Sequence, residues 1–558
     1  MFSSPLHFVI GIIAILKAGG AYVPIDPDLP ISRLQYILDD IKAYIILVDS
    51  LTGDKIPSTF ARIICLDESQ KLINQSSPDN LSLAINSSQL AYVIYTSGTT
   101  GKAKGVMIEH QGVVSLATAD YVMIGIEDIC IQLSDMSFDA ATFEIWSILL
   151  NGAGLLMLEE PNKLIANTDC LQQKLIEESI TIMWLTRSLF DQLYLLNKNL
   201  FKSLNYLLVG GEALNKKLIS ELLLSDTRPK HLINGYGPTE NTTFSCTYNI
   251  ESKGLINSAN VSIGRPISNR KAYILTNDMN PSPIGAIGEL YVGGAGLARG
   301  YLNNTALTKE RFILNPYQTS EEKNLGTNKN LYKTGDIARW LSEGNIEYIG
   351  RKDFQVKIRG YRIELGEIES VLLNYQGIDQ CVALLKESKL EDDVSENKYL
   401  VAYYVSHKSL SEEDIFSYLR RTLPEYMIPN SLVYLENLPL TVNGKLDIKA
   451  LPEHNLTNEK QYVAPRNDIE KIICTVWGEC LGILSEKIGI HDDFFMLGGN
   501  SLLAIKIISK MRSNANLDIS IMDLFQYKTI ALILSNHSIK QNNINKESES
   551  KLYEEFHV

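Results

Sequence analysis

The chain has 558 residues, 45% of them hydrophobic and 21% charged, with a formal net charge of −13 and a pI near 5.3. This length exceeds what one hydrophobic core can organise, so we expect three or four domains. The acidic balance argues against a nucleic-acid partner or an anionic membrane surface, because both need clustered lysine and arginine.

The seven cysteines are scattered and show no CxxC or paired Cys/His spacing, which favours a reducing compartment. An apolar run at residues 8–16 could imitate a signal peptide. It is too short to span a bilayer and no lysine or arginine precedes it, so we predict a core helix. We expect a cytoplasmic protein with no membrane partner.

Across the first 350 residues, short apolar runs alternate with amphipathic helical patterns, which predicts α/β layers. The clearest predicted strands are residues 44–48, 92–95, 206–209 and 289–292. Each is followed within two residues by Gly, Ser or Asp, and functional loops are expected after such strand ends.

After residues 350–360 the pattern restarts on a smaller scale. Strands are predicted near 381–385 and 399–405, and a helix opens at Ser411 with a capping-box pattern. From residue 468 the residues 469, 472, 473, 476, 477, 480 and 481 fall on one helical face, which predicts a small helical bundle. The expected domains are 1–352 (large), 353–452 (small α+β), 453–463 (linker), 464–538 (helical bundle) and 539–558 (polar tail).

The segment YTSGTTGKAKG, residues 95–105, follows a predicted strand and is rich in hydroxyls, glycines and lysines. Such a loop suits phosphate, because its backbone can approach an anion closely. It is not a Walker A loop, since Lys102 is followed by Ala103 and not by Ser or Thr. The alternative to a phosphate-binding loop is a flexible surface turn. The expected phosphate-binding residues are Thr96, Ser97, Gly98, Thr99, Thr100, Gly101, Lys102 and Lys104.

Two further clusters suit a nucleotide. In NGYGPTE, residues 234–240, the Tyr236 ring could stack on a purine, while Thr239 and Glu240 offer hard oxygens suited to Mg²⁺. Taken alone, the cluster could be a turn with a buried tyrosine. YKTGD, residues 332–336, adds Asp336, which could chelate ribose hydroxyls, and Arg351 follows it.

In combination and order, these motifs resemble the adenylation domain of a nonribosomal peptide synthetase, followed by its thiolation (peptidyl carrier) domain. The segments that carry the resemblance are LKAGGAYVPID (16–26), YTSGTTGKAKG, FDAATFEIW (138–146), NGYGPTE, GELYVGGAGLARGYLN (288–303), YKTGD, GRKDFQVKIRGYRIELGEIE (350–369), LPEYMIP (423–429), NGKLD (443–447) and FFMLGGNSLLAIKI (494–507). The resemblance implies an α/β large adenylation subdomain with a small α+β C-terminal subdomain, then an all-α four-helix carrier domain.

The resemblance also implies the reaction. An amino acid carboxylate attacks the α-phosphate of ATP to give aminoacyl-AMP, and a carrier thiol then takes the aminoacyl group. Mg²⁺ at Glu240 and the cation of Lys445, otherwise an ordinary exposed lysine, would neutralise the reacting oxygens. Lys445 and the phosphate loop lie in different predicted subdomains, so activity requires closure about a hinge at Asp353. Further implied site residues are Thr239 (catalytic) and Gly211, Glu212, Asn234 and Gly237 (nucleotide).

Ser501 lies in LGGNSLL, where two glycines and an asparagine lead into a predicted helix. A hydroxyl at a helix N-terminus is a natural anchor for a phosphodiester, although a plain N-cap serine is the alternative. The resemblance implies that Ser501 carries 4′-phosphopantetheine, attached by a phosphopantetheinyl transferase.

In the family, the Asp of the FDA segment pairs with the substrate α-ammonium, so Asp139 and Lys445 imply an α-amino acid. The other expected pocket residues are Ala140, Phe143, Trp184, Leu208, Gly210, Gly235, Thr243 and Phe244. This lining has no charge at its far end, which excludes Lys, Glu and Arg substrates. We expect the two glycines to give room near the α-carbon, and we predict L-valine, with isoleucine or another short aliphatic amino acid as the runner-up.

The resemblance has two departures. Adenylation domains usually carry about fifty more residues before the LKAGGAYVPID motif, and Ala103 replaces the usual proline of the phosphate loop. The alternative function is therefore an inactive, truncated domain that serves only as a carrier or docking scaffold. Neighbouring synthetase modules are expected as partners.

Overall fold

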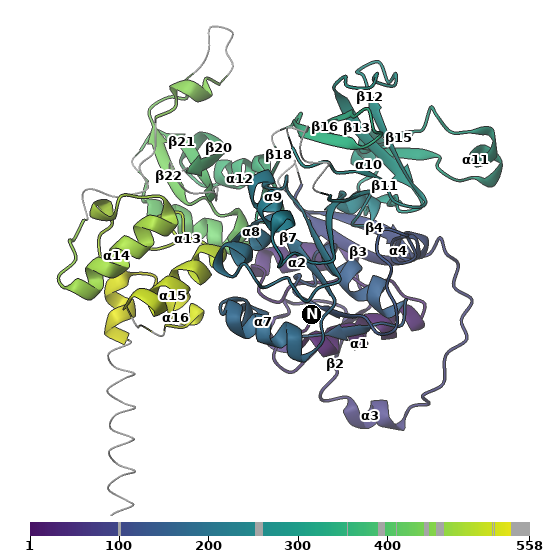
Figure 1. Cartoon of the computed structure of the whole chain (residues 1–558), viewed down its shortest axis with the longest axis horizontal. Helices are drawn as coiled ribbons and strands as arrows, with labels where there is room; N and C mark the ends of the chain where they lie inside the picture. The colour runs from purple at the N-terminus through teal and green to yellow at the C-terminus, as the bar shows by residue number, and fades with distance from the viewer. Residues whose placement is uncertain are drawn as a thin grey trace, which may run out of the picture. The chain divides into compact units, whose positions relative to one another are not determined.

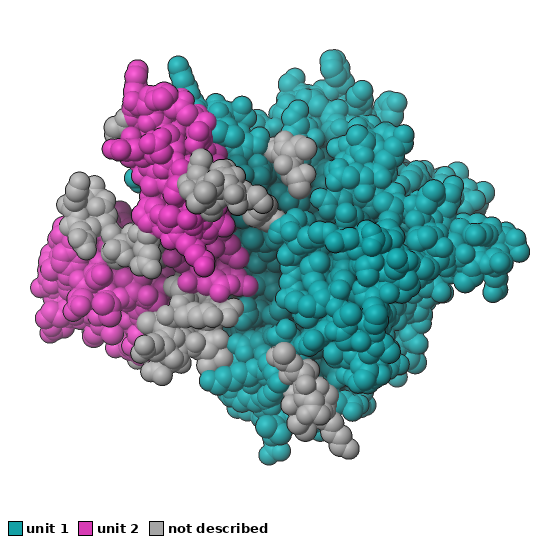
Figure 2. Space-filling view, turned by 90° about the horizontal axis from the view of Figure 1, so that it is seen from above, with its two compact units in different colours: residues 1–161, 172–376, 410–428 teal, residues 162–171, 377–409, 429–558 magenta. Residues whose placement is uncertain are grey.

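The computed structural model describes residues 1–98, 102–251, 260–353, 355–388, 397–408, 410–439, 446–452, 462–515, 517 and 519–536. The predicted site residues Thr99, Thr100, Gly101 and Lys445, most of the predicted linker and the tail at 539–558 lie outside them. Contacts divide the chain into two compact units (Figure 2). Unit 1 comprises residues 1–161, 172–376 and 410–428, and unit 2 comprises residues 162–171, 377–409 and 429–558.

Unit 1 is built around a seven-stranded sheet with the strand order β11-β10-β9-β8-β7-β5-β6. Two of its strands, β7 and β11, are labelled in Figure 1. Strands β5 to β9 run parallel to one another, and β10 and β11 add antiparallel pairs at one edge. The interior strands are nearly continuous apolar runs, as expected of parallel strands buried on both faces. The bounds are β5 Ile129–Ile131, β6 Gly154–Leu156, β7 Ile182–Thr186, β8 Tyr206–Gly210, β9 His231–Tyr236, β10 Cys246–Asn249 and β11 Arg265–Pro266.

Helices connect these strands and follow the expected α/β alternation. Thr186 caps α8 by accepting a hydrogen bond from Leu189, and Asn215 caps α9 in the same way. The helices of the first 230 residues are α1 Pro5–Lys17, α2 Ile31–Ile41, α3 Gln70–Gln75, α4 His110–Ala117, α5 Ala140–Thr142, α6 Pro161–Ile165, α7 Thr168–Glu177, α8 Arg187–Leu196 and α9 Lys216–Leu224. The predicted core helix at residues 8–16 is part of α1.

Smaller sheets complete unit 1. One has the order β14-β4-β3, another has β12-β13-β16-β15 with β17 paired to β16, and two-stranded sheets are formed by β1 with β2 and by β18 with β19. The bounds are β1 Ile45–Val48, β2 Arg62–Cys65, β3 Leu90–Thr96, β4 Lys104–Glu109, β12 Arg270–Leu275, β13 Gly288–Gly294, β14 Gly300–Tyr301, β15 Phe312–Leu314, β16 Asn330–Trp340, β17 Ile346–Arg351, β18 Gln355–Ile358 and β19 Tyr361–Glu364. Helices α10 Thr305–Arg311, α11 Ser320–Leu325, α12 Leu365–Leu373 and α13 Glu412–Thr422 also belong to unit 1.

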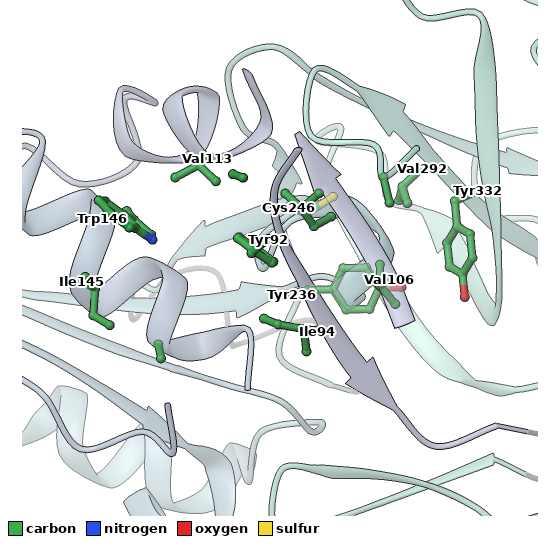
Figure 3. Packing of buried hydrophobic residues seen from close by; sticks show 14 of the residues in the cluster. Tyr92, Ile94, Val106, Val113, Ile145, Trp146, Tyr236, Cys246, Val292 and Tyr332 are labelled. Atoms are coloured by element: carbon green, nitrogen blue, oxygen red, sulfur yellow. The ribbon is translucent and has the colours of Figure 1, made fainter. Parts of the chain in front are cut away.

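The main core of unit 1 joins strands from several sheets. Tyr92 and Ile94 of β3, Val106 of β4 and Tyr236 of β9 belong to one buried cluster, which Figure 3 shows from close by. Tyr332 of β16 belongs to the same cluster. This core therefore fixes the strands on which the predicted nucleotide motifs lie or after which they begin.

Unit 2 contains a three-stranded sheet and a separate helical core. The sheet has the order β20-β21-β22, with β20 Ile378–Ser388, β21 Asn397–Ser406 and β22 Ser431–Leu435. The helices are α14 Asp468–Leu481, α15 Ser501–Ala515 and α16 Ile521–Tyr527, and residues 530–536 are also helical. Trp477 and Phe494 are fully buried at the centre of the helical core, with ring centroids 5.3 Å apart.

The predicted strands and the helix after Ser411 are confirmed. Ser411 caps α13 by accepting a hydrogen bond from the backbone N–H of Asp414. One part of the predicted apolar face of α14 is wrong, because Ile469 is 46% and Ile472 36% exposed. The helix buries only the part of that face that contacts its own bundle. Within the described residues, we find no helix with the length and apolar character needed to cross a bilayer.

Candidate active site and carrier serine

Four of the predicted substrate-pocket residues lie in the parallel strands β7, β8 and β9. Trp184 of β7 pairs with Leu208 of β8, and Gly210 of β8 pairs with Gly235 of β9. Phe143 lies in a π-helical turn, residues 143–147, after α5. Such turns often occur at functional sites. The predicted residues Ala140, Phe143, Trp184, Leu208 and Phe244 all belong to one apolar cluster.

Three aromatic rings close this cluster. The Phe244 ring centroid lies 5.5 Å from that of Phe143 and 5.1 Å from that of Trp184. A Cβ atom on Gly235 would lie 2.7 Å from the Phe244 ring, and one on Gly210 would lie 2.7 Å from the Trp184 ring. The expectation that these glycines leave open room is therefore wrong, because the rings occupy the space beside them.

Asp139 directly precedes Ala140 of this apolar cluster. Burial raises the pKa of its carboxyl group, and a hydrogen bond from the Thr239 side chain opposes that rise. The hydroxyl of Thr243 donates to the backbone carbonyl of Asp139 at 2.6 Å. Thr242 and Thr243 have φ values of 51° and 62°, which are strained for β-branched residues and are common at functional sites. Asp139 is thus a half-buried carboxyl group that, when ionised, is suited to pair with an ammonium group.

The predicted base and ribose residues contact each other. Tyr236 donates a short hydrogen bond from its hydroxyl to Asp336, and Nη1 of Arg351 lies 2.7 Å from the other oxygen of that carboxylate. Arg351 also forms a bidentate pair with Asp353, with distances of 2.7 and 2.8 Å. Burial alone would raise the pKa of Asp353, but Arg351 holds it below its usual value. The predicted hinge residue is therefore tied to the predicted ribose residue through one arginine.

Glu240, the predicted magnesium ligand, is the centre of a buried charge network. Its carboxylate accepts hydrogen bonds from Nη1 of Arg362 at 2.7 Å and from the Tyr301 hydroxyl at 2.8 Å, and Nζ of Lys104 lies 3.3 Å away. Burial opposes ionisation, yet Arg362 and Lys104 hold the pKa of Glu240 well below its usual value. Burial and the neighbouring Arg362 lower the pKa of Lys104 to about 8.

The predicted phosphate loop connects β3 and β4 as an antiparallel pair in which Thr96 faces Lys104. The Thr96 hydroxyl is buried and finds no hydrogen-bond partner in the part of the chain that is described. Lys102 is exposed, whereas Lys104 points into the Glu240 network. The Thr96 hydroxyl is therefore a donor that remains available, as a phosphate site requires.

The other predicted nucleotide residues have structural contacts. Asn234 donates from its side chain to the backbone carbonyl of Ser262, and Glu212 accepts a hydrogen bond from the backbone N–H of Gly360. Gly211 has a φ of 81°. A Cβ atom on Gly237 would lie 2.1 Å from the carbonyl oxygen of Thr243, so only glycine fits there.

Sequence reasoning missed Arg362, Glu367 and Lys357, although all three lie in the quoted segment GRKDFQVKIRGYRIELGEIE. Lys357 is partly buried, with its Nζ 5.8 Å from the Tyr236 ring centroid, and desolvation lowers its pKa. One sequence signal could have identified them: the segment carries many charged residues among apolar strand residues, which indicates that some of the charges are buried.

Magnesium fits the residues present. Glu240 is one ionised, buried carboxylate, and the described residues include no group of three or more potential metal-ligating side chains. Mg²⁺ is usually held by one or two carboxylates together with substrate phosphates, so a single carboxylate beside a phosphate loop suits it.

Ser501 is the first residue of α15. The side chain of Asn500 accepts a hydrogen bond from the backbone N–H of Leu503 at 2.9 Å, so Asn500 caps the helix. A Cβ atom on Gly499 would lie 2.3 Å from the carbonyl oxygen of Phe494, which explains the glycine before the cap. The alternative of Ser501 as a plain N-cap is wrong, because Asn500 has that role.

Comparison with known families accounts for most of the chain. Residues 2–302 match the AMP-binding enzyme family, residues 367–445 match the AMP-binding enzyme C-terminal domain, and residues 471–535 match the phosphopantetheine attachment site.

Curated relatives include tyrocidine synthase 3 of Brevibacillus parabrevis, which is 42% identical over 94% of this chain. Gramicidin S synthase 2 of Brevibacillus brevis is 40% identical, also over 94% of this chain. The chain spans only 8% and 11% of the lengths of these two relatives.

A similar solved structure is holo-PA1221, a nonribosomal peptide synthetase protein containing adenylation and PCP domains bound to a vinylsulfonamide inhibitor. It has a TM-score of 0.76 and 30% identity, covering 94% of this chain and 85% of the other. The chain therefore belongs to the AMP-binding enzyme family, as an amino-acid adenylating ligase of nonribosomal peptide synthesis followed by the carrier domain that receives the acyl group as a thioester.

Proposed function

We propose that this ligase activates L-valine as valyl-AMP and loads it as a thioester on a phosphopantetheine arm at its own Ser501. The observation that carries the substrate proposal is the set of packed aromatic rings of Phe143, Trp184 and Phe244 beside the half-buried carboxyl group of Asp139. The carboxylate suits an α-ammonium group, and the apolar floor suits a short aliphatic side chain. Isoleucine is the runner-up, because a pocket discriminates one methylene by only about 1–3 kcal/mol.

In the first step, a carboxylate oxygen of the amino acid attacks the α-phosphorus of ATP, and the bond to the β-phosphate oxygen breaks to release pyrophosphate. Asp139 would hold the ammonium group and Thr239 would orient Asp139. Tyr236, Asp336 and Arg351 would hold the nucleoside. Lys445, which lies outside the described residues, would neutralise the reacting carboxylate and phosphate oxygens.

The cation proposed at Glu240 is Mg²⁺, with Thr239 adjacent in sequence. When bound, Mg²⁺ would neutralise charge on the phosphate oxygens. Burial raises the pKa of Glu240, but the positive charges of Arg362 and Lys104 lower it by more, so the carboxyl group stays ionised and can bind a cation. Ser97 and Gly98 would hold the outer phosphates together with the rest of the loop.

In the second step, the thiol of the arm attacks the carbonyl carbon of valyl-AMP, forming the thioester and releasing AMP. The arm would be attached by a phosphopantetheinyl transferase, and neighbouring synthetase modules would take the valyl group onward. The alternative of an inactive scaffold is not favoured, because Asp139, Glu240 and Asp336 are assembled in one unit with their partners.

The test is amino-acid-dependent exchange of labelled pyrophosphate into ATP across all twenty amino acids, with Lys445→Ala as the control. We expect the fastest exchange with valine and loss of exchange in the variant. Fastest exchange with a charged or aromatic amino acid would refute the pocket assignment. Intact mass after incubation with coenzyme A and a phosphopantetheinyl transferase tests Ser501, with Ser501→Ala expected to gain no mass.

A further inference from the structure

Arg270, the first residue of β12, carries a buried guanidinium group that the proposed reaction does not use. The residue is 4% exposed, and burial lowers its pKa to about 10, so the group stays charged at neutral pH. Within the described part of the chain it pairs with no carboxylate, and its Nη1 atom has no hydrogen-bond partner. Tyr92 and Tyr121 lie near it, but burial raises both of their pKa values, so neither supplies a negative charge.

Such an unpaired charge is costly inside a protein. A well-packed apolar side chain in the same place is often at least as stabilising. The retention of Arg270 in the core therefore indicates a role other than stability.

The guanidinium group contacts the backbone of the predicted substrate pocket. Nε of Arg270 donates to the carbonyl of Phe244 at 3.4 Å, and Nη2 donates to the carbonyl of Gly112 in α4 at 3.3 Å. A Cβ atom on Gly296 would lie 1.7 Å from Nη1, so the guanidinium group fills the space that a side chain at residue 296 would need. One planar cation thus lies against three segments that are far apart in the sequence.

The backbone that Arg270 contacts is strained. Thr242 and Thr243 have φ values of 51° and 62°, and strained backbone persists only where its surroundings hold it in place. The Thr242 hydroxyl donates to the carbonyl of Gly296 at 2.7 Å, directly beside the guanidinium group. Arg270 therefore supports this segment at both ends, at Phe244 through a hydrogen bond and at Thr242 through Gly296.

We propose that Arg270 is a positioning residue for substrate selection, because it holds residues 242–244, and with them the Phe244 ring, at the place that sets the size of the amino-acid pocket. The inference rests on the proposed function, in which Phe244 lines that pocket. The Phe244 ring centroid lies 5.5 Å from that of Phe143 and 5.1 Å from that of Trp184. A shift of Phe244 therefore changes the space that these three rings leave for a substrate side chain.

Arg270→Met tests this role, because it removes the donors and leaves an unbranched apolar side chain. Exchange of pyrophosphate into ATP is measured with valine, isoleucine and leucine, and KM is determined separately for the amino acid and for ATP. We expect the preference in kcat/KM for valine over leucine to fall about tenfold, because a pocket discriminates methylene groups only while its walls stay in place. The KM for ATP is expected to change by less than about twofold, since uniform binding of the nucleotide is unaffected. An unchanged preference, or an equal rise in both KM values, would overturn the proposal.

Arg265→Met is the matched control. Arg265 of β11 donates to the side chain of Asn345 at 3.2 Å and to the carbonyl of Glu343, but it is exposed and is expected to keep the parent preference after substitution. An equal loss of preference in this variant would contradict a specific role for Arg270. Urea unfolding checks that each variant folds. Arg270→Lys provides the same test if Arg270→Met does not fold, because an ammonium group lacks the fork that reaches two carbonyls.

Hydrogen–deuterium exchange without substrate tests the positioning independently of catalysis. The backbone N–H of Phe244 donates to the carbonyl of Thr242 at 2.9 Å, and that of Ser245 donates to the carbonyl of Tyr236 at 2.8 Å. In Arg270→Met we expect faster exchange in peptides that cover residues 243–246, while peptides from α9 keep the parent rate. Parent-like exchange at residues 243–246 would show that Arg270 does not hold this segment.

The two measurements separate this inference from the proposed function. If the parent prefers an amino acid other than valine and Arg270→Met shifts that preference, the valine proposal fails and the role of Arg270 stands. If the parent prefers valine while the variant keeps both the preference and the slow exchange, the role of Arg270 fails alone.

Discussion

Tyr236 donates a hydrogen bond to Asp336 across 100 positions of sequence, joining the residues assigned to the adenine and the ribose. Asp336 also pairs with Arg351, so the three side chains form one buried polar group. The coupling means that the proposed nucleoside site is built as a unit rather than from independent contacts.

Replacing Tyr236 with phenylalanine removes the hydroxyl but keeps the ring. A hydrogen bond to a charged group contributes about 1.5–3 kcal/mol, and its loss leaves one Asp336 oxygen less well satisfied. We expect the KM for ATP to rise about tenfold while the KM for valine changes little. Steady-state exchange kinetics with each substrate varied in turn measure this, and an equal rise in both KM values would argue against a nucleoside role.

Gly235→Ala tests the aromatic rings of Phe143, Trp184 and Phe244 as the floor of the proposed substrate pocket. The new Cβ atom would meet the Phe244 ring at 2.7 Å and displace it, which typically costs about 1–3 kcal/mol. We expect kcat/KM for valine to fall about tenfold or more, with a shift in preference among aliphatic amino acids. Gly350→Ala is the matched control, because its Cβ atom would meet nothing within 4 Å. Identical amino-acid specificity in the two variants would show that these aromatic rings do not line the substrate pocket.

Glu144 gives the stability of unit 1 a pH dependence. Its carboxylate accepts backbone hydrogen bonds from Leu133 and Ser134, yet burial raises its pKa from the usual 4.5 to about 7. Between these values the folded state holds a proton that the unfolded state has lost, so this contribution to stability is full below pH 4.5 and is lost as pH rises through 7.

In Glu144→Gln this titration is absent. We therefore expect the free energy of unfolding to fall less steeply between pH 5 and pH 7.5 than in the parent, by up to about 3 kcal/mol. Urea unfolding at several pH values measures the slope. Parallel slopes in the two proteins would show that Glu144 titrates at its ordinary pKa.

Trp477→Ala tests whether the helical core of unit 2 is separable from adenylation. Truncating a fully buried tryptophan costs about 3–5 kcal/mol, so we expect the carrier helices to unfold and Ser501 to remain unmodified. Exchange of pyrophosphate into ATP should persist, because unit 1 has its own core. Leu484→Ala, at a side chain 62% exposed, is the control and should behave as the parent does. Loss of exchange in Trp477→Ala alone would show that the two cores depend on each other.

The sequence by itself determined the secondary structure and the identity of the chemical motifs. Residues 206–209 are predicted as a buried strand because their apolar run has the length of a strand and is bounded by turn residues. Ser411 predicts a helix start because its side chain can accept a hydrogen bond from a backbone N–H three residues later. Both features depend on contacts within a few residues, so periodicity and capping chemistry suffice to predict them.

The tertiary structure alone decided which groups satisfy one another. The rings of Trp184 and Phe244 fill the space beside Gly210 and Gly235. The sequence alone predicts open space there. Arg362 donates a hydrogen bond to Glu240, which is 122 positions away in the sequence, and no local sequence pattern predicts that pairing. Long-range pairing follows from how the sheets pack and from the need to satisfy each buried charge, and both are properties of the assembled core.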